Sequence, residues 1–229
     1  MKVASYNIRK AVGLDWRRDP HRIVDVIGEI DADIVVLQEA DKRLGQRPGV
    51  LPLDRLEIEH GYTLARRAFE GQSHGWHGNA ILFRKADFPQ PRIERIALPA
   101  REPRGAILAH FQQFGFAVIG AHLALTTGMR KKQIQTLCAH AGNSGIPTII
   151  AGDFNHWGRH LPAGGHHVVT PGLTFHASRR IAALDRFILC GDIALLRSAV
   201  HVSMKSRRAS DHLPVVLEFD IATGRKKAC

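Results

Sequence analysis

The sequence predicts an α+β fold in which one β-sheet packs on another and helices cover the outside. Three observations support this prediction. The chain has many apolar segments of strand length but only two substantial segments with helical periodicity. The strand-length segments are continuously apolar rather than alternating, which is typical of buried strands. The chain has 229 residues, 45% of them hydrophobic, so we expect a single domain over 1–221, with a basic tail over 222–229.

The N-terminal part is expected to begin with a strand over the first seven residues. Asp19-Pro20 then provides an N-cap followed by proline at the first helical position. Apolar residues recur at helical spacing after this dipeptide and predict an amphipathic helix over 20–30. A short apolar strand over 33–39, bounded by acidic residues, and a short helix over 52–60 complete this part.

The remaining elements are mostly strands. Five strands are expected before the second long helix, over 62–69, 79–84, 92–98, 104–111 and 114–123. The helix is expected over 128–141. Its apolar side is formed by Ile134, Leu137 and Cys138, and its solvent side by Arg130, Lys131 and Lys132. Four strands complete the chain, over 146–153, 183–190, 192–203 and 213–219.

Charge and cysteine content limit the possible partners and compartments. The net charge of +11 favours an anionic partner, which is nucleic acid, a phosphorylated small molecule or an acidic membrane surface. Cys138, Cys190 and Cys229 have no metal-type spacing and indicate a reduced compartment. No apolar run approaches the length of a signal peptide or a spanning helix. We therefore expect a cytoplasmic, monomeric protein.

Polar residues stand at the ends of several expected strands. Glu39 follows one apolar strand, and Asp153 and Asn155 follow another, each of these strands being preceded by a helix. Asp185 and the dipeptide Asp211-His212 stand instead at strand entrances. Exits and entrances meet at one edge if the strands run antiparallel, and Asn7, at the exit of the first strand, belongs to the same edge. The sequence thus predicts a cluster of acidic groups.

Such a cluster requires a cation or shared protons. Two unit charges about 4 Å apart repel by about 4 kcal/mol at an effective dielectric constant of 20. Carboxylate and amide oxygens suit a hard metal such as Mg²⁺ or Mn²⁺, which usually takes only one or two carboxylates. Glu39, Asp211 and Asn7 fit this pattern. The other polar residues are then available to transfer protons and to orient the reacting groups. They are Asp153, Asn155, Asp185 and His212.

Each residue alone has a simpler explanation. Glu39 could be a solvated charge, although the sequence offers it no evident pairing role. Asp211-His212 could cap a turn, and Asp185 could pair with Arg186. His122, at the end of an apolar strand, could be an ordinary half-buried histidine. The joint occurrence at compatible strand ends favours a site.

Seven motifs in a fixed order carry a family resemblance. They are "YNI" (6–8), "LQE" (37–39), "GNAILFR" (78–84), "AHL" (121–123), "GDFN" (152–155), "LDRFIL" (184–189) and "SDHLPV" (210–215). This set, which spans nearly the whole chain, resembles the endonuclease/exonuclease/phosphatase superfamily, in particular its deoxyribonuclease/sphingomyelinase-like branch. The resemblance implies a four-layer α/β/β/α sandwich, with two mixed β-sheets flanked by helices.

The resemblance also implies a role for each candidate residue. Glu39 matches the principal metal ligand, beside Asn7 and Asp211, and the metal is Mg²⁺ or Mn²⁺. Asp153 and Asn155 match the groups that handle the attacking water. His212 matches the essential histidine at the scissile phosphate, and Asp185 the carboxylate that orients it. His122 matches a second histidine of the family, but no acid that would orient it is evident in the sequence. Arg101, Arg104 and Asn79 match residues that contact the phosphate.

These observations predict a metal-dependent phosphodiester hydrolase that activates water, most of all a nuclease acting on DNA or RNA. Two basic runs beside the acidic edge, at 130–132 and 205–208, are expected to follow a polyanion. Trp157 is placed to stack on a base or to cover the core. The alternative is a phosphoesterase acting on a phospholipid or a small phosphorylated metabolite. A binding module without catalysis is a third possibility, although all the expected catalytic positions are filled.

Overall fold

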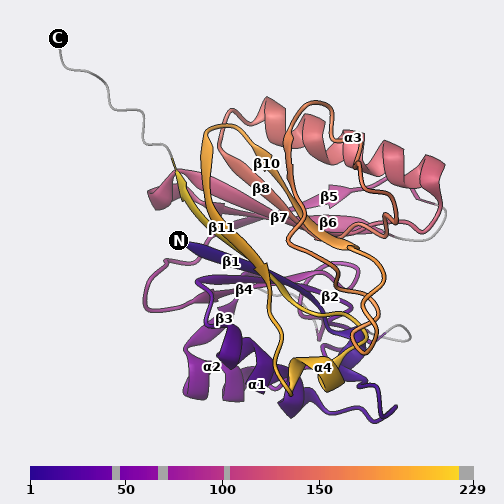
Figure 1. Ribbon diagram of the computed structural model, residues 1–229. Helices are drawn as coiled ribbons and strands as arrows, with labels where there is room; N and C mark the ends of the chain where they lie inside the picture. The colour runs from indigo at the N-terminus through magenta and orange to yellow at the C-terminus, as the bar shows by residue number, and fades with distance from the viewer. Residues whose placement is uncertain (43–46, 67–71, 101–103, 222–229) are drawn as a thin grey trace.

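The computed structural model describes residues 1–42, 47–66, 72–100 and 104–221. It confirms the predicted fold class. Two mixed six-stranded sheets lie face to face, and helices cover their outer sides (Figure 1). In the described part of the chain, no helix is both long and apolar enough to cross a membrane.

The first sheet consists of strands from both ends of the chain. They are β1 (Lys2–Asn7), β2 (Ile34–Gln38), β3 (Tyr62–Leu64), β4 (Ala80–Arg84), β11 (Ile193–Val200) and β12 (Val215–Ile221). Their order across the sheet is β11-β12-β1-β2-β4-β3. Only β1 and β2 pair in parallel, and the other neighbours are antiparallel. The sheet thereby places the end of β1 beside the end of β2 and the start of β12.

The second sheet is formed by the middle of the chain. Its strands are β5 (Arg92–Ala97), β6 (Gly105–Phe111), β7 (Phe116–His122), β8 (Thr148–Asp153), β9 (His167–Val169) and β10 (Asp185–Cys190). Their order is β5-β6-β7-β8-β10-β9, with β7 and β8 parallel and the other pairs antiparallel. The ends of β7 and β8 therefore meet the start of β10.

The helices lie on opposite sides of the two sheets. They are α1 (Pro20–Ile30), α2 (Leu53–His60), α3 (Thr127–Asn143) and the single turn α4 (Ser206–Ala209), with short 3₁₀ turns η1 (Arg9–Ala11) and η2 (Gln112–Phe114). Helices α1, α2 and α4 lie on the side of the first sheet, and α3 covers the second sheet (Figure 1). Asp19 caps α1 as expected, because its side chain accepts a hydrogen bond from the backbone N–H of Arg22.

Three apolar clusters separate the four layers. The cluster between the sheets is rich in aromatic rings, including Phe83, Phe111, Phe116, Phe187 and Phe219, all of which are fully or almost fully buried. A second cluster joins the first sheet to α1 and α2, and a third joins the second sheet to α3. The sheets are buried on both faces, which explains the continuously apolar strands in the sequence.

The structure departs from the sequence predictions in a few places. Strand β3 ends at Leu64, five residues before the predicted end, and residues 67–69 lie outside the described residues. Strand β9 and the turn α4 were not predicted, because both are too short to show a period. The solvent-facing position predicted for Arg130 is wrong. Its guanidinium is buried and donates hydrogen bonds to the carbonyls of Ala124 and Leu125, which lie before the helix.

Candidate active site

The second sheet brings three candidate residues into one row. Asp153, the last residue of β8, pairs in register with His122 at the end of parallel β7 and with Asp185 at the start of antiparallel β10. This is the meeting of strand exits and entrances that the sequence predicted. Because the three residues stand at neighbouring ends of adjacent strands, their side chains lie at the same edge of the sheet.

The first sheet delivers the other candidates to the facing edge. Asn7 ends β1, and Glu39 follows β2 directly. The hydroxyl of Ser210 donates a 2.7 Å hydrogen bond to the carbonyl of Asn7, which holds Asp211 beside the end of β1. The two edges are joined by the amide of Asn7, whose Nδ2 donates a 3.0 Å hydrogen bond to Oδ2 of Asp153.

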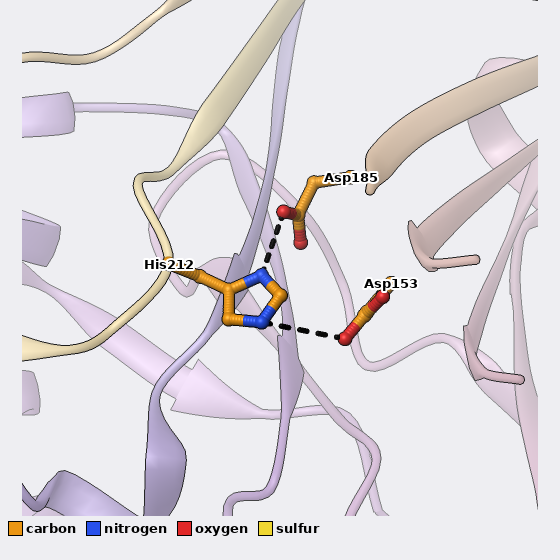
Figure 2. A group of neighbouring side chains, drawn as sticks. All are labelled: Asp153, Asp185 and His212. Atoms are coloured by element: carbon orange, nitrogen blue, oxygen red, sulfur yellow. Dashed lines mark hydrogen bonds and ion pairs between the residues drawn. The ribbon is translucent and has the colours of Figure 1, made fainter. Parts of the chain in front are cut away.

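His212 lies between two carboxylates (Figure 2). Its Nδ1 donates a 2.8 Å hydrogen bond to Oδ2 of Asp185, and its Nε2 lies 3.6 Å from Oδ2 of Asp153. All three side chains are buried. Burial, the largest influence, lowers the pKa of His212, but Asp185, Asp153 and Asp211 together outweigh it and raise the pKa to about 9. His212 is therefore a cation at neutral pH.

The proton between His212 and Asp185 belongs to the imidazole. Burial also raises the pKa of the Asp185 carboxyl, against the attraction of His212, so both partners compete for this proton. The imidazole faces a second carboxylate on its other nitrogen, and that contact favours the imidazolium. The alternative that Asp185 pairs with Arg186 is wrong. The Arg186 guanidinium donates to the carbonyls of Ala183, His156 and Gly158 instead.

His122 has the opposite electrostatic state. Burial lowers its pKa to about 4, and the charges of Arg104, His212 and Lys10 add to this effect, while Asp153 opposes it. Its Nε2 lies 3.6 Å from Oδ2 of Asp153. The side chain is thus neutral at pH 7, and the carboxylate beside it is one that it shares with His212. Two histidines on one aspartate accordingly differ in charge.

Asp153 is the centre of the arrangement. Besides its contacts with both histidines, Oδ2 accepts the hydrogen bond from Asn7, and Oδ1 accepts a 2.8 Å hydrogen bond from the backbone N–H of Asn155. Asn155 adopts a left-handed backbone conformation, with φ of 50°, and its Nδ2 donates to the carbonyl of Leu123. The side chain of Asn155 therefore anchors the turn after β8, and its backbone fixes the carboxylate of Asp153.

The predicted metal ligands fit a hard divalent ion in their chemistry. Asn7, Glu39 and Asp211 offer oxygen atoms at one edge, and the two carboxylates keep 24% and 22% of their side-chain surface exposed. Each carboxylate has a cationic partner in the structure. Lys10 Nζ pairs with Glu39, and Arg9 Nε lies 3.4 Å from Asp211. The sequence-based statement that Glu39 has no pairing role is therefore wrong.

A second set of possible ligands fits a metal less well. The ligand atoms of Asp153, Asp185 and His212 lie within 4.8 Å of one another. A histidine binds a metal as the neutral imidazole, and Nδ1 of His212 is already hydrogen-bonded to Asp185. The hydrogen bond between His212 and Asp185 suits proton transfer, and Asn7, Glu39 and Asp211 remain the set that the sequence predicts for the metal.

The predicted phosphate contacts are placed as follows. Arg104 donates hydrogen bonds to the carbonyls of His122 and Leu123, at the end of β7. Asn79 is buried and donates to the carbonyls of Gly105 and Trp76, so its amide N–H groups join β4 to β6. Arg101 lies outside the described residues.

Sequence reasoning missed four residues of this edge. Lys10 and Arg9 pair with the expected metal ligands, Ser210 tethers two strands, and Phe175 lies with its ring 5.0 Å from that of His212. The run "NIRKA" after the first strand was a usable signal, because cations at the exit of a site-forming strand reach the acids of that site. Phe175 belongs to an irregular segment and gave no signal.

Comparison with known proteins agrees with this geometry. A model of the endonuclease/exonuclease/phosphatase family matches residues 4–212. The Escherichia coli K12 protein YbhP, described as uncharacterized, is 25% identical in an alignment of 256 positions, gaps included, that covers 96% of each chain.

Two solved structures share the fold. Mannosyl-6-phosphatase Bt3783 of Bacteroides thetaiotaomicron is 20% identical, with a TM-score of 0.70 over 96% of this chain and 100% of the other. TDP2 of D. rerio, solved in complex with a single-strand DNA product, is 18% identical, with a TM-score of 0.71 over 96% and 98%. At these identities the similarity shows the fold alone.

Proposed function

Because the chain belongs to the endonuclease/exonuclease/phosphatase family, whose members are hydrolases acting on phosphoesters, we propose that it is a Mg²⁺- or Mn²⁺-dependent phosphodiester hydrolase, and specifically a nuclease. The observation that carries the proposal is the position of His212. A buried imidazolium, oriented by Asp185 and placed beside Asp153, puts a proton donor next to a carboxylate that can accept a proton. Hydrolysis of a phosphodiester by water requires both groups.

Each residue of the site has a different role in the proposed reaction. Asp153 accepts the proton of the attacking water, with its carboxylate held by Asn7 and Asn155. As the water oxygen forms the new P–O bond and the bond to the leaving oxygen breaks, the Nε2–H of His212 protonates the leaving oxygen. His122, which is neutral, contributes a hydrogen bond without adding charge. Glu39, Asp211 and Asn7 would hold a divalent ion, which would supply further charge neutralisation as a Lewis acid.

Surface features beside the site support nucleic acid as the substrate. Trp157 leaves 61% of its surface exposed, and its ring lies edge-on to Phe175, which contacts His212. An exposed ring at this distance from the reacting phosphate suits stacking on a base. Exposed cations stand on two segments that border the site, at the start of α3 and in α4. They are Lys131, Lys132, Arg207 and Arg208.

The first test is a substrate panel. Purified protein with Mg²⁺ or Mn²⁺ is offered single- and double-stranded DNA, RNA, a phospholipid and a phosphomonoester. We expect cleavage of at least one polynucleotide and loss of that cleavage in EDTA. Turnover of the lipid or the monoester alone would show that the nuclease assignment is wrong and favour the metabolite alternative, in line with the activity named for Bt3783. Binding without cleavage of any substrate would indicate a binding module.

The basic segments can be tested through the salt dependence of binding. We expect Lys131→Gln/Lys132→Gln and Arg207→Gln/Arg208→Gln to weaken DNA binding. Each lost phosphate contact is expected to reduce the slope of log K against log [salt] by about 0.9 for duplex DNA, because fewer counterions are released. The slope is measured by fluorescence anisotropy between low and physiological salt. Arg130 is omitted from the first variant because it is buried.

A matched control separates this effect from a general loss of charge. Arg92→Gln/Lys85→Gln also removes two exposed cations, but from strand β5 and the turn after β4. It should bind DNA like the wild type. All three variants should hydrolyse a small phosphodiester at the wild-type rate, since that reaction needs only the acidic edge, His122 and His212. Equal slopes in the control and test variants would contradict a phosphate-binding role.

A further inference from the structure

Lys10 is directed into the site rather than into solvent. Its ammonium pairs with the Glu39 carboxylate, and the two side chains keep 29% and 24% of their surface exposed. The same ammonium is near enough to His122 to disfavour a second positive charge there. Lys10 thus pairs with the predicted principal metal ligand.

The backbone holds Lys10 there at an energetic cost. Three consecutive residues, Arg9, Lys10 and Ala11, adopt left-handed conformations with φ of 46°, 55° and 60°, and Glu39 does so with φ of 54°. A left-handed conformation costs roughly 1–2 kcal/mol for each non-glycine residue. Such conformations persist where surrounding contacts impose them, and they cluster at functional sites.

Hydrogen bonds from neighbouring strands impose this conformation. The backbone N–H of Lys10 donates to the carbonyl of Glu39 at 3.0 Å, so the two paired residues are also joined through the main chain. The N–H of Arg9 donates to Oδ1 of Asn7 at 3.1 Å, and that of Ala11 to the carbonyl of Ile8 at 2.7 Å. The turn η1 is therefore tied to two of the three predicted metal ligands.

The pairing has a consequence for metal binding. A divalent ion and an ammonium group compete for the same carboxylate oxygens, and each neutralises the charge that attracts the other. Lysine suits such an exchange, because its ammonium is a point charge on a long flexible stem and can move without its backbone. The Arg9–Asp211 pair follows the same pattern with a weaker contact of 3.4 Å.

We propose that Lys10 is an exchangeable counter-ion of Glu39: it neutralises this carboxylate before a divalent ion binds, is displaced by the ion, and then contacts the substrate phosphate. The inference rests on the proposed function in requiring a metal at Glu39. In this proposal the ammonium of Lys10 lowers the affinity for the metal and raises the affinity for the substrate. Removing the ammonium should strengthen metal binding and weaken substrate binding.

The test measures Mn²⁺ binding to the purified protein without substrate, by isothermal titration calorimetry or by the loss of the free Mn²⁺ electron paramagnetic resonance signal. Lys10→Met removes the charge but keeps the length of the side chain, and we expect it to bind Mn²⁺ about fivefold more tightly, the effect of losing one partly exposed ion pair. Lys10→Arg keeps the charge and should bind no more tightly than the wild type. Lys2→Met removes one charge from the opposite end of β1 and should bind like the wild type.

A second measurement uses the substrate. At saturating Mn²⁺, Lys10→Met should raise KM for a phosphodiester severalfold, while Lys2→Met leaves it unchanged. Unchanged or weaker Mn²⁺ binding by Lys10→Met overturns the inference, as does the absence of Mn²⁺ binding to both wild type and variant. Tighter Mn²⁺ binding by a protein that cleaves no polynucleotide supports the exchange and contradicts only the nuclease assignment. Circular dichroism confirms folding, and Lys10→Gln replaces the Met variant if that variant does not fold.

Discussion

Replacing His212 with alanine is expected to lower kcat/KM for phosphodiester hydrolysis by on the order of 10²-fold or more, the range that a general acid or base supplies. His212 is buried between Asp185 and Asp153. Asp185→Ala should lose a similar factor. The double variant should be little worse than His212→Ala, because Asp185 acts as a positioning residue through the imidazole. Initial rates of the four proteins complete the cycle.

A pH profile distinguishes this role from a structural one. The pKa of His212 is raised to about 9, so the imidazolium is present at lower pH and is lost as the pH rises through that value. Without the charge of Asp185 the pKa should fall toward the usual value for histidine of about 6.5. The alkaline limb of the Asp185→Asn profile should therefore move to lower pH. Multiplicative losses in the double variant, or an unmoved limb, would show that the residues act independently.

His201→Ala is the matched control for this cycle. His201 is half-buried and contacts Glu29 at 3.3 Å. Removing it should leave kcat/KM within about twofold of the wild type, as is usual for surface positions. A large loss in this control would indicate that the assay reports general destabilisation rather than catalysis.

Replacing Glu39 with glutamine is expected to abolish nearly all Mg²⁺-dependent activity while the protein folds normally. The substitution keeps the size of the side chain and leaves an oxygen that can contact Lys10, but it removes the negative charge with which Glu39 would bind a hard cation. Glutamine is preferable to alanine, because alanine leaves the ammonium of Lys10 without this partner. Activity is measured against Mg²⁺ concentration, and thermal melts report the fold.

Metal removal supplies the complementary result. EDTA should abolish the activity of the wild type, and excess Mg²⁺ or Mn²⁺ should restore it. Glu57 lies on α2, and its exposed carboxylate pairs with Lys85. Glu57→Gln removes this carboxylate and should respond to both metals like the wild type. Full wild-type activity in excess EDTA, or unchanged turnover by Glu39→Gln, would remove the metal from the mechanism.

Most of the fold, and the meeting of Asp153 with Asp185 and His122 at one edge, were predictable from the sequence. Buried strands such as β2 and β8 are mostly apolar and end in polar residues, whereas β10 begins with Asp185 and Arg186 and continues as an apolar run, so their boundaries are visible in the chain. Strand exits and entrances then predicted which residues share an edge, and the register of Asp153 with Asp185 agrees with that prediction. Elements of three or four residues, such as β9 and α4, were missed because periodicity needs a longer window.

The sequence by itself therefore determined the layers of the fold and which polar residues come together, because strand length, apolar content and order along the chain specify both. Only the tertiary structure decided their electrostatic states. His122 and His212 both stand at strand ends, yet one is neutral and the other charged, because charge depends on burial and on groups brought near through space. For the same reason Arg130 became a buried donor to backbone carbonyls, and Lys10 became the partner of Glu39, 29 residues away in the chain.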